Sequence, residues 1–334
     1  MYLFSSATAE VAAAESYLAA VVAEELIRPV PPEVLTVAEA IRRRHGATVA
    51  ALLFYGSCLR TQTVTDGVLD FYVLVDTYRA AYSSWRLRLL NALLPPNVFS
   101  LEAQAGQKIL RAKYAVISMR HFARAATLRG IHAIVWARFC QPTGLAYVRD
   151  EQARALVIRA LVTSIMTMVT RMVALVPGCG ETIRCRPEDL WQRGFWETYR
   201  TEWRAEKLET IRRLYHAAPE RYDRVTHAVL SELERQGIVR VRRVDGAVLE
   251  LTMRAPDRRR LAYGWRVRRP LAKGLYAIRL LKTAATFRDW LPYVLWKLER
   301  QTGIQITASE RQRRHPFLLG GPLVLKLLLR RAFR

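Results

Sequence analysis

The spacing of apolar residues predicts that helices and strands alternate in the first half of this chain. Apolar residues recur at helical spacing over residues 8–26, 32–44 and 80–93. Shorter apolar runs, bounded by turn residues, predict strands at residues 47–54, around Asp70, at 98–104 and at 109–119. Elements in this order predict an α+β fold, in which a mixed sheet is flanked by helices.

The second half of the chain is predicted to be mainly helical. Residues 153–176 form its most apolar helix, but Arg159 and Arg171 interrupt the apolar run. We therefore interpret its apolar stripe as part of the protein core rather than as a lipid-facing surface. Further on, a helix at 221–235 precedes two strand-like runs that are joined at Asp245-Gly246, which is typical of a hairpin turn.

A helix that is followed by a hairpin favours a winged-helix-like module. The chain then divides into four predicted units, which are a core at residues 1–148, a helical region at 149–218, a winged-helix-like module at 219–270 and a basic amphipathic tail at 271–334.

Positive charge is concentrated at the carboxyl-terminal end. The sequence holds 53 Lys and Arg against 29 Asp and Glu, a net charge of +24. Residues 256–334 alone hold nineteen basic and four acidic residues. Such an excess favours a polyanionic partner, which is either nucleic acid or an anionic membrane. An excess of Arg is also typical of GC-rich coding sequences, which offers a second explanation for part of the charge.

The interleaving of basic and apolar residues in the tail favours a membrane surface over nucleic acid. Basic residues such as Arg279 and Lys282 recur between apolar residues at helical spacing, and Trp290, Tyr293 and Trp296 are aromatic residues of the kind that lie at a bilayer interface.

The tail is predicted to lie on a membrane rather than to cross it. Its uncharged run at residues 316–325 is much shorter than the ~20 residues that a spanning helix needs. The alternative is that the apolar faces of residues 275–300 pack on the rest of the protein.

The clearest chemical signal is the stretch at residues 52–76, which reads LLFYGSCLRTQTVTDGVLDFYVLVD. Tyr55 follows an apolar strand, Gly56 permits a tight turn, and Ser57 offers an amide and a hydroxyl to phosphate oxygens. Asp70, on the next apolar strand, stands where a Mg²⁺ ion would be held. Phosphate donors and a carboxylate-held metal ion are the groups that a nucleotidyl transfer from a nucleoside triphosphate uses.

The second carboxylate that normally accompanies the first in such sites is missing. Tyr72 shares a strand face with Asp70 and occupies the position of the second acid. Asp76 lies on the same face, but at about 3.3 Å per residue it is roughly 20 Å away. Glu102, on a neighbouring predicted strand, is the nearest acidic candidate for a second metal ligand.

Two basic residues are candidates for contacting phosphate groups. Lys113 alternates with Ala112 and Tyr114 along a predicted strand, so its ammonium group can reach into the site. A solvated lysine at a sheet edge is the alternative. Arg138 follows an apolar helix face and is a candidate for clamping the triphosphate or the phosphate of an acceptor, in a chain where many Arg residues have no such role.

These motifs resemble the mitochondrial-type (translocator assembly and maintenance) phosphatidate cytidylyltransferases over most of the chain. Tyr55-Gly56-Ser57 is similar to the family's Tyr-Gly-Ser turn, and Asp70-Phe71-Tyr72 to its single Asp followed by an aromatic residue. Lys113-Tyr114-Ala115-Val116 is similar to its Lys-Tyr-Gly-Val segment, and residues 137–142 resemble its Gly-Arg-Leu-Gln-Lys-Pro segment.

The resemblance implies a nucleotidyltransferase-type fold and a cytidylyltransferase activity. CTP and phosphatidic acid would be the substrates, CDP-diacylglycerol and pyrophosphate the products, and Mg²⁺ the cofactor. Together with the candidates from the residue pattern, the predicted site residues are Asp70 and Lys113 for catalysis, Tyr55, Gly56, Ser57 and Arg138 for the nucleotide, and Asp70 with Glu102 for the metal. The implied location is the cytoplasmic face of a bacterial membrane or the matrix face of the mitochondrial inner membrane, as a peripheral protein.

The chain also departs from the family. Cys58 replaces a glycine, and Asn97-Val98-Phe99-Ser100 lacks the His and Tyr of the family's Asn-x-x-His-Tyr-Ser segment. These departures bear on the identity of the acceptor. Two other hypotheses stay open: a nucleotidyltransferase of the same fold that acts on nucleic acid or protein, and a membrane or nucleic-acid binding protein in which Tyr72 marks a decayed metal site.

Overall fold

The computed structural model describes residues 17–63, 67–128, 130, 132–179, 181–202 and 208–286. The predicted membrane-contact helices beyond residue 286, with Trp290, Tyr293 and Trp296, lie outside the described residues. So does the first part of the predicted helix at 8–26, whose described part, residues 17–26, is helical.

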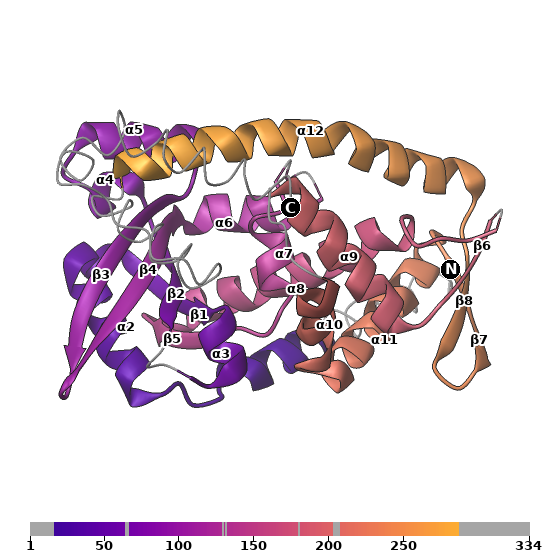
Figure 1. Cartoon of the computed structure of the whole chain (residues 1–334), viewed down its shortest axis with the longest axis horizontal. Helices are drawn as coiled ribbons and strands as arrows, with labels where there is room; N and C mark the ends of the chain where they lie inside the picture. The colour runs from indigo at the N-terminus through magenta and orange to yellow at the C-terminus, as the bar shows by residue number, and fades with distance from the viewer. Residues whose placement is uncertain are drawn as a thin grey trace, which may run out of the picture.

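A five-stranded mixed sheet forms the first half of the structure, which confirms the predicted α+β class (Figure 1). The strands are β1 (Val49–Tyr55), β2 (Val68–Val75), β3 (Asn97–Ala105), β4 (Lys108–Ser118) and β5 (Gly144–Val148). They lie in the order β3-β4-β2-β1-β5. The β2–β4 pair is parallel and the other neighbours are antiparallel.

Helices pack on both faces of this sheet, which explains why its central strands are apolar at successive positions. The helices on one side are α2 (Pro32–His45), α4 (Tyr78–Ala81) and α5 (Trp85–Leu93), and those on the other are α6 (Met119–Ala126), α7 (Trp136–Phe139) and α8 (Glu151–Val173). Asp70 and Tyr72 belong to the second face, because Tyr72 is buried in the cluster that includes Phe122 and Phe139.

The single helix predicted at residues 80–93 is divided into α4 and α5. Between the two helices the chain turns to bury Tyr82, whose hydroxyl accepts a hydrogen bond of 3.1 Å from Asn91 Nδ2. Asn91 also donates to the carbonyl of Val116 on β4 (2.9 Å). The break therefore anchors α5 to the sheet.

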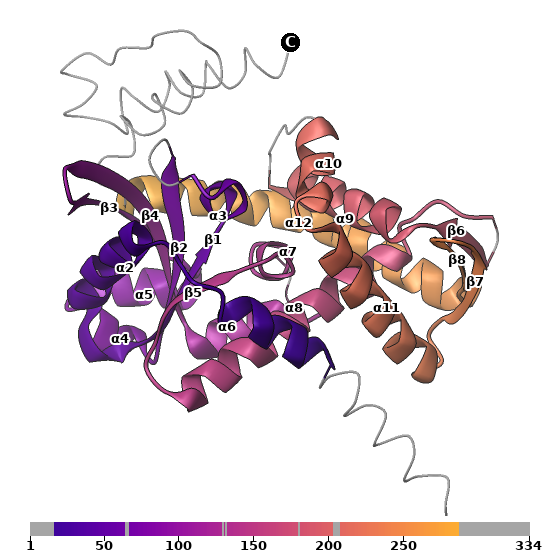
Figure 2. The same ribbon diagram turned by 90° about the horizontal axis from the view of Figure 1, so that it is seen from below.

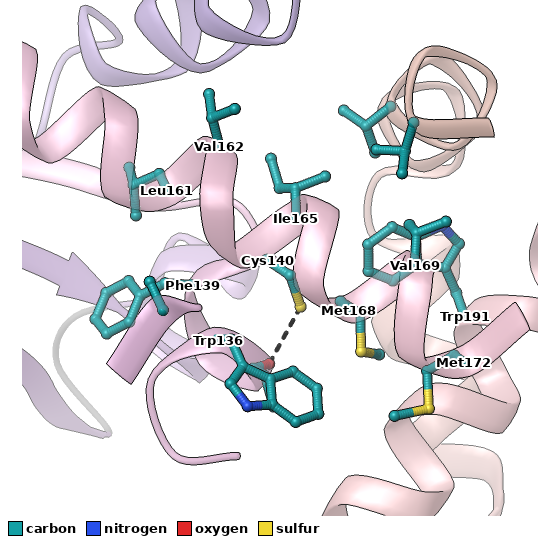
Figure 3. Close-up of a cluster of buried hydrophobic side chains, with 14 of the residues drawn as sticks. Trp136, Phe139, Cys140, Leu161, Val162, Ile165, Met168, Val169, Met172 and Trp191 are labelled. Carbon is teal, nitrogen blue, oxygen red and sulfur yellow. Dashed lines mark hydrogen bonds between the residues drawn. The ribbon is translucent and has the colours of Figure 1, made fainter. Parts of the chain in front are cut away.

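α8 is the central helix of the protein core, as the sequence predicts. It is long and apolar enough to cross a membrane, but 72% of its most apolar window is buried inside the protein. Figure 3 shows Met168 and Met172 of α8 near Trp191 of α9 (Pro187–Thr201). A Cβ at Gly194 of α9 would lie 2.9 Å from Met172 Cγ, so this glycine allows the two helices to approach closely.

The second half of the structure contains a three-stranded antiparallel sheet and helices packed beside it. Its elements are β6 (Thr182–Cys185), α9, α10 (Leu208–His216), α11 (Pro219–Arg235), β7 (Arg240–Asp245) and β8 (Val248–Thr252), with the strands in the order β6-β8-β7. The predicted hairpin is present, with Gly246 at φ +47° in its turn. Strand β6 was not predicted, because only Ile183 and Cys185 point inward and two apolar residues give no strand signal.

Strand β6 extends this sheet beyond the predicted amino-terminal boundary of the winged-helix-like module at residue 219. One continuous apolar cluster runs from Leu53 on β1 through Ile165 on α8 to Leu251 on β8. The two sheets therefore share a core. The division of the chain into the four units given above stays a prediction.

A long helix, α12 (Ala255–Thr286), runs along one side of the molecule from the three-stranded sheet to α5 (Figures 1 and 2). It contacts α8, α9 and β3. Lys282 near its end is buried and donates to the carbonyls of Leu94 and Pro96. The sequence pattern places Lys282 among the basic residues predicted to face a membrane, whereas in the structure its ammonium group anchors α12 at the start of β3.

Candidate functional site

The turn after β1 brings Gly56 against the carboxylate of Asp70. Tyr55 is opposite Asp70 in the β1–β2 register, so Gly56 is the first residue beyond the ladder. Gly56 has φ +94° and ψ −157°, a conformation that is essentially restricted to glycine. A Cβ at this position would lie 2.9 Å from Asp70 Oδ2. Both the backbone conformation and the available space therefore require glycine.

Ser57 and Cys58 begin the short helix α3 (Ser57–Thr61) next to this turn. Ser57 is exposed, and its hydroxyl makes no hydrogen bond with any described residue. Cys58, at the position where the resembled family has glycine, is buried, and its thiol donates to the carbonyl of Val68. A Cβ at Gly67 would collide with the Cys58 sulfur, so Gly67 makes the room that Cys58 needs.

Asp70 is half-buried, and no described residue donates a hydrogen bond to its carboxylate or forms an ion pair with it. The carboxylate oxygens of Asp70 are therefore available to bind a cation or to accept a hydrogen bond from a ligand. Asp76, at the far end of β2, differs in this respect, because both of its oxygens accept from Arg149 (2.6 and 3.2 Å).

Tyr72 is a structural aromatic residue in the position where a second acid would stand. Its side chain is 3% exposed and makes edge contacts with the rings of Tyr55 and Phe139, at centroid distances of 5.5 and 4.9 Å. Phe122 also packs on it, at 6.2 Å. An unpaired carboxylate in this apolar cluster would be costly, which accounts for the missing acid in physical terms.

Lys113 is the basic residue that the fold brings next to Asp70. The parallel β2–β4 register pairs Asp70 directly with Lys113, and neighbouring strands lie about 4.8 Å apart. Paired residues in adjacent strands point to the same face, so the two side chains share the face of the sheet that Tyr72 occupies. Lys113 is half-buried. This arrangement agrees with its predicted location, and its catalytic role stays a prediction.

Glu102 is not brought together with Asp70. It lies two strands away and two residues along, which corresponds to roughly 12 Å between the Cα atoms. Its carboxylate accepts from Arg111 Nε at 2.9 Å in an exposed ion pair. The geometry therefore gives no support to Glu102 as a second ligand of the same metal ion.

Arg138 forms a buried ion pair with a residue that the sequence analysis did not single out. Its Nη1 and Nη2 donate to the two carboxylate oxygens of Glu202, both at 2.8 Å, and Nη1 also donates to the carbonyl of Ile134. Burial alone would lower the pKa of Arg138, but the Glu202 carboxylate raises it well above its ordinary value. The structure thus uses Arg138 to join α7 to the end of α9, and its predicted phosphate clamp is not supported by this geometry.

Glu202 also lines a pocket that the sequence analysis missed. The pocket lies between α12, the end of α9 and the segment before α7, and is lined by His132, Ala133, Ile134, Thr201, Glu202, Ala272, Tyr276 and Arg279. These residues come from three segments that are far apart in the sequence. The sequence shows only that Arg279 recurs among apolar residues at helical spacing, a pattern that predicts a position facing a membrane.

The described residues fit a magnesium ion that binds together with substrate phosphates. They fit less well a magnesium ion that is held by protein side chains alone. No group of three His, Cys, Asp or Glu side chains comes together within the part of the chain that the structure describes. Mg²⁺ keeps several waters and is commonly bound through one or two carboxylates together with substrate phosphates. The open carboxylate of Asp70 next to Ser57 meets that lower requirement.

Comparisons with known proteins give little further guidance. No protein-family model matches the chain, and no curated protein sequence matches it. Eight chains among solved structures match. One is a nucleotidyltransferase-like protein from Exiguobacterium sibiricum, with 9% sequence identity and a TM-score of 0.26, in an alignment that covers 67% of this chain and 100% of that chain. A similarity this low supports no argument about function.

Proposed function

We propose that this protein is a nucleotidyltransferase that transfers a cytidylyl group from CTP to phosphatidic acid, or to a related lipid phosphate, at a membrane surface. The products are CDP-diacylglycerol and pyrophosphate. The observation that carries the proposal is the approach of the Gly56 turn to the Asp70 carboxylate, with 2.9 Å between the position of a Cβ and Asp70 Oδ2. A glycine turn held against an open carboxylate suits a triphosphate that carries its own metal ion.

In this proposal Ser57 and the Gly56 turn bind the β- and γ-phosphates. Asp70 would hold the Mg²⁺ ion of the triphosphate complex, and the ion would offset the negative charge that develops on the phosphate oxygens. Lys113 lies beside Asp70 in the β2–β4 register and supplies a further positive charge next to the α-phosphorus.

The acceptor oxygen attacks the α-phosphorus, and the bond between the α- and β-phosphates breaks to release pyrophosphate. A phosphate monoester has a second pKa of about 6, so it is largely dianionic at neutral pH. No side chain has to remove a proton from it. A site with one carboxylate, next to the buried Tyr72, is therefore sufficient for this acceptor, whereas a hydroxyl acceptor would need a general base.

The outer face of α12 supports action at a membrane. Tyr263, Val267, Leu271 and Ile278 are exposed, and their spacings of four, four and seven residues keep them within about 80° of one another around the helix axis. The helix contains nine Lys or Arg and one acidic residue, Asp257. An exposed apolar stripe on a basic helix is typical of binding to an anionic bilayer surface.

A second exposed stripe lies on α5, at the end of the molecule that α12 reaches (Figure 1). Trp85, Leu89 and Leu93 follow one another at four-residue spacing and are 65%, 48% and 73% exposed. Nucleic-acid binding requires basic residues but does not require exposed aliphatic side chains. Both stripes therefore favour a lipid acceptor over a nucleic acid.

The proposed function is tested by measuring pyrophosphate release from each of the four ribonucleoside triphosphates with Mg²⁺, with and without phosphatidic acid vesicles. We expect release from CTP only when vesicles are present, and a CDP-lipid as the second product. Release with nucleic acid instead of vesicles, falling steeply with salt, would favour the nucleic-acid acceptor. No release under any of these conditions, with vesicles still bound, would leave only the binding-protein hypothesis.

The matched variants are Asp70→Asn and Asp76→Asn, which make the same chemical change at the two ends of β2. Asp70→Asn should lower kcat by about 100-fold or more without unfolding the protein, because it removes the carboxylate from the site. Asp76→Asn removes only an exposed ion pair with Arg149 and should change kcat little. Equal activity of the two variants would refute the role of Asp70.

A further inference from the structure

The pocket beneath α12 holds a positive charge that no described residue balances. In Figure 1, α12 passes over α7 and α9 at this place. The Nε and Nη1 atoms of Arg279 are shielded from solvent, and no described residue accepts a hydrogen bond from either. Burial lowers the pKa of Arg279 to about 10, so its guanidinium is still charged at neutral pH. Shielded donor atoms without an acceptor are costly, so these two atoms can accept a partner that the described residues do not supply.

The neighbouring charges do not supply this partner. Glu202 is the one acidic residue among the pocket-lining side chains, and both of its oxygens already accept from Arg138. Lys282 lies one turn further along α12, and burial together with Arg279 lowers its pKa to about 7. Its ammonium group donates to the carbonyls of Leu94 and Pro96, and it is not among the side chains that line the pocket. Arg279 is therefore the charged basic side chain that lines the pocket.

The remaining wall of the pocket offers neutral polar groups. Burial and the nearby Arg279 lower the pKa of His132 to about 4, so its imidazole is uncharged at neutral pH and has one donor and one acceptor nitrogen. Tyr276 contributes a phenolic hydroxyl from the same helix as Arg279. The hollow is partly open to solvent, and its empty volume of about 180 Å³ includes part of that open space. The enclosed part is much smaller, so the hollow suits a small group that enters from solvent and stays partly exposed.

We propose that this pocket is a phosphate-binding site that takes the phosphate group of a phosphate monoester, with Arg279 as its main ligand. A phosphate monoester carries about −1.5 to −2 charges at neutral pH and three acceptor oxygens, so it can accept from more donors at once than the two oxygens of a carboxylate. The donors around it are the guanidinium of Arg279, the Tyr276 hydroxyl and His132. The site itself does not depend on the proposed transferase function.

The pocket is next to the candidate catalytic face. The Tyr72 side chain is close enough to both Arg138 and Arg279 to affect the pKa of each guanidinium. Tyr72 is two residues from Asp70 on the same face of β2, a separation of about 6.6 Å between the Cα atoms. The identification of the bound monoester as the acceptor lipid phosphate rests on the proposed function.

The test compares ligand binding by the full-length protein and by Arg279→Met, with Arg212→Met as the control. Arg212 is exposed on α10 and makes no interaction with a described residue. Binding of inorganic phosphate, of dihexanoyl phosphatidic acid and of acetate is measured by calorimetry, and Tm is measured with and without each ligand. We expect both phosphate ligands to bind at least tenfold more tightly than acetate and to raise Tm by several degrees.

Arg279→Met should raise Kd for both phosphate ligands at least tenfold, and Arg212→Met should leave Kd unchanged. Because Arg279→Met removes a buried unpaired charge, the free variant should melt at the same temperature as the parent or higher, which separates lost binding from misfolding. Equal Kd values for the parent and Arg279→Met, or equal binding of acetate and phosphate by the parent, would overturn the proposal. Tighter binding of the lipid than of inorganic phosphate identifies the lipid as the source of the phosphate, and the reverse order identifies free phosphate.

The failure of this proposal and that of the proposed function are distinguishable. Asp70→Asn should abolish turnover but leave phosphate binding at Arg279 unchanged. In the active enzyme, Arg279→Met should raise KM for the lipid phosphate at least tenfold and leave KM for CTP unchanged. An increase in KM for CTP alone would contradict the assignment of the pocket to the acceptor.

Discussion

Replacing Gly56 by alanine tests whether the glycine turn positions the Asp70 carboxylate. Gly56 has φ +94° and ψ −157°, and an alanine held in such a sparsely populated region costs about 1–3 kcal/mol. The new Cβ would also lie 2.9 Å from Asp70 Oδ2, which is too close, so the carboxylate or the turn has to move. We therefore expect Gly56→Ala to reduce both stability and activity.

Gly46 provides a matched control for the backbone strain. It ends α2 with φ +70° and ψ −154°, a conformation close to that of Gly56, but a Cβ there would meet nothing within 4 Å. Gly46→Ala should lose about 1–3 kcal/mol of unfolding free energy and keep its activity. Gly56→Ala should lose at least as much stability and in addition lower kcat about 100-fold, since a displacement of about 1 Å at a reacting group has an effect of this size.

The assays are urea unfolding and pyrophosphate release. The double variant Gly56→Ala/Asp70→Ala isolates the contact, because removing the carboxylate removes the clash while the strain stays. It should be more stable than the sum of the two single changes predicts. If Gly56→Ala matches Gly46→Ala in both stability and kcat, the turn does not position Asp70 and the reasoning is refuted.

Two further predictions concern the buried ion pair between Arg138 and Glu202 and the exposed apolar face of α12. Arg138→Met removes the bidentate partner of the buried Glu202 carboxylate, so urea unfolding should show a loss of about 3–5 kcal/mol. The double variant Arg138→Met/Glu202→Gln should restore most of this loss. A loss below about 1 kcal/mol in the single variant would argue against a stabilising role of the pair. Leu271→Glu on the outer face of α12 should weaken cosedimentation with anionic vesicles about tenfold, because burial of one leucine contributes about 1–2 kcal/mol. Leu208→Glu on α10, at a similarly exposed leucine, is the control, and an equal effect of the two changes would contradict a membrane contact through α12.

The sequence predicted the sheet well because its strands carry strong local signals. Residues 47–54 are a nearly continuous apolar run, and the strand predicted at 109–119 contains the apolar run 114–117. Gly106 and Gly246 mark turns that the structure confirms with positive φ angles. The elements that were missed or merged have weak local signals. Strand β6 has two inward apolar residues, and the break between α4 and α5 depends on the contact of Tyr82 with Asn91 and β4, which no local pattern reveals.

The candidate site was predictable only where its residues lie in one motif or on adjacent strands. Gly56 and Asp70 are fourteen residues apart and form opposite sides of one strand pair, so their spacing was informative. The parallel register that pairs Asp70 with Lys113 could be expected only in general terms. Glu102 and Arg138 were chosen by residue type, and their actual partners, Arg111 and Glu202, depend on tertiary packing that the sequence does not display.

The two faces of α12 link the surface of the protein to its interior. Ile278 and Arg279 are consecutive, so they point about 100° apart around the helix, and one is on the exposed stripe while the other lines the pocket. A monoester bound at Arg279 would therefore lie beneath the same helix turn that exposes an apolar residue to solvent. A lipid whose acyl chains stay in a membrane needs its phosphate to be received at this kind of boundary, and a soluble substrate does not. If the proposed function holds, this arrangement favours a lipid phosphate as the acceptor.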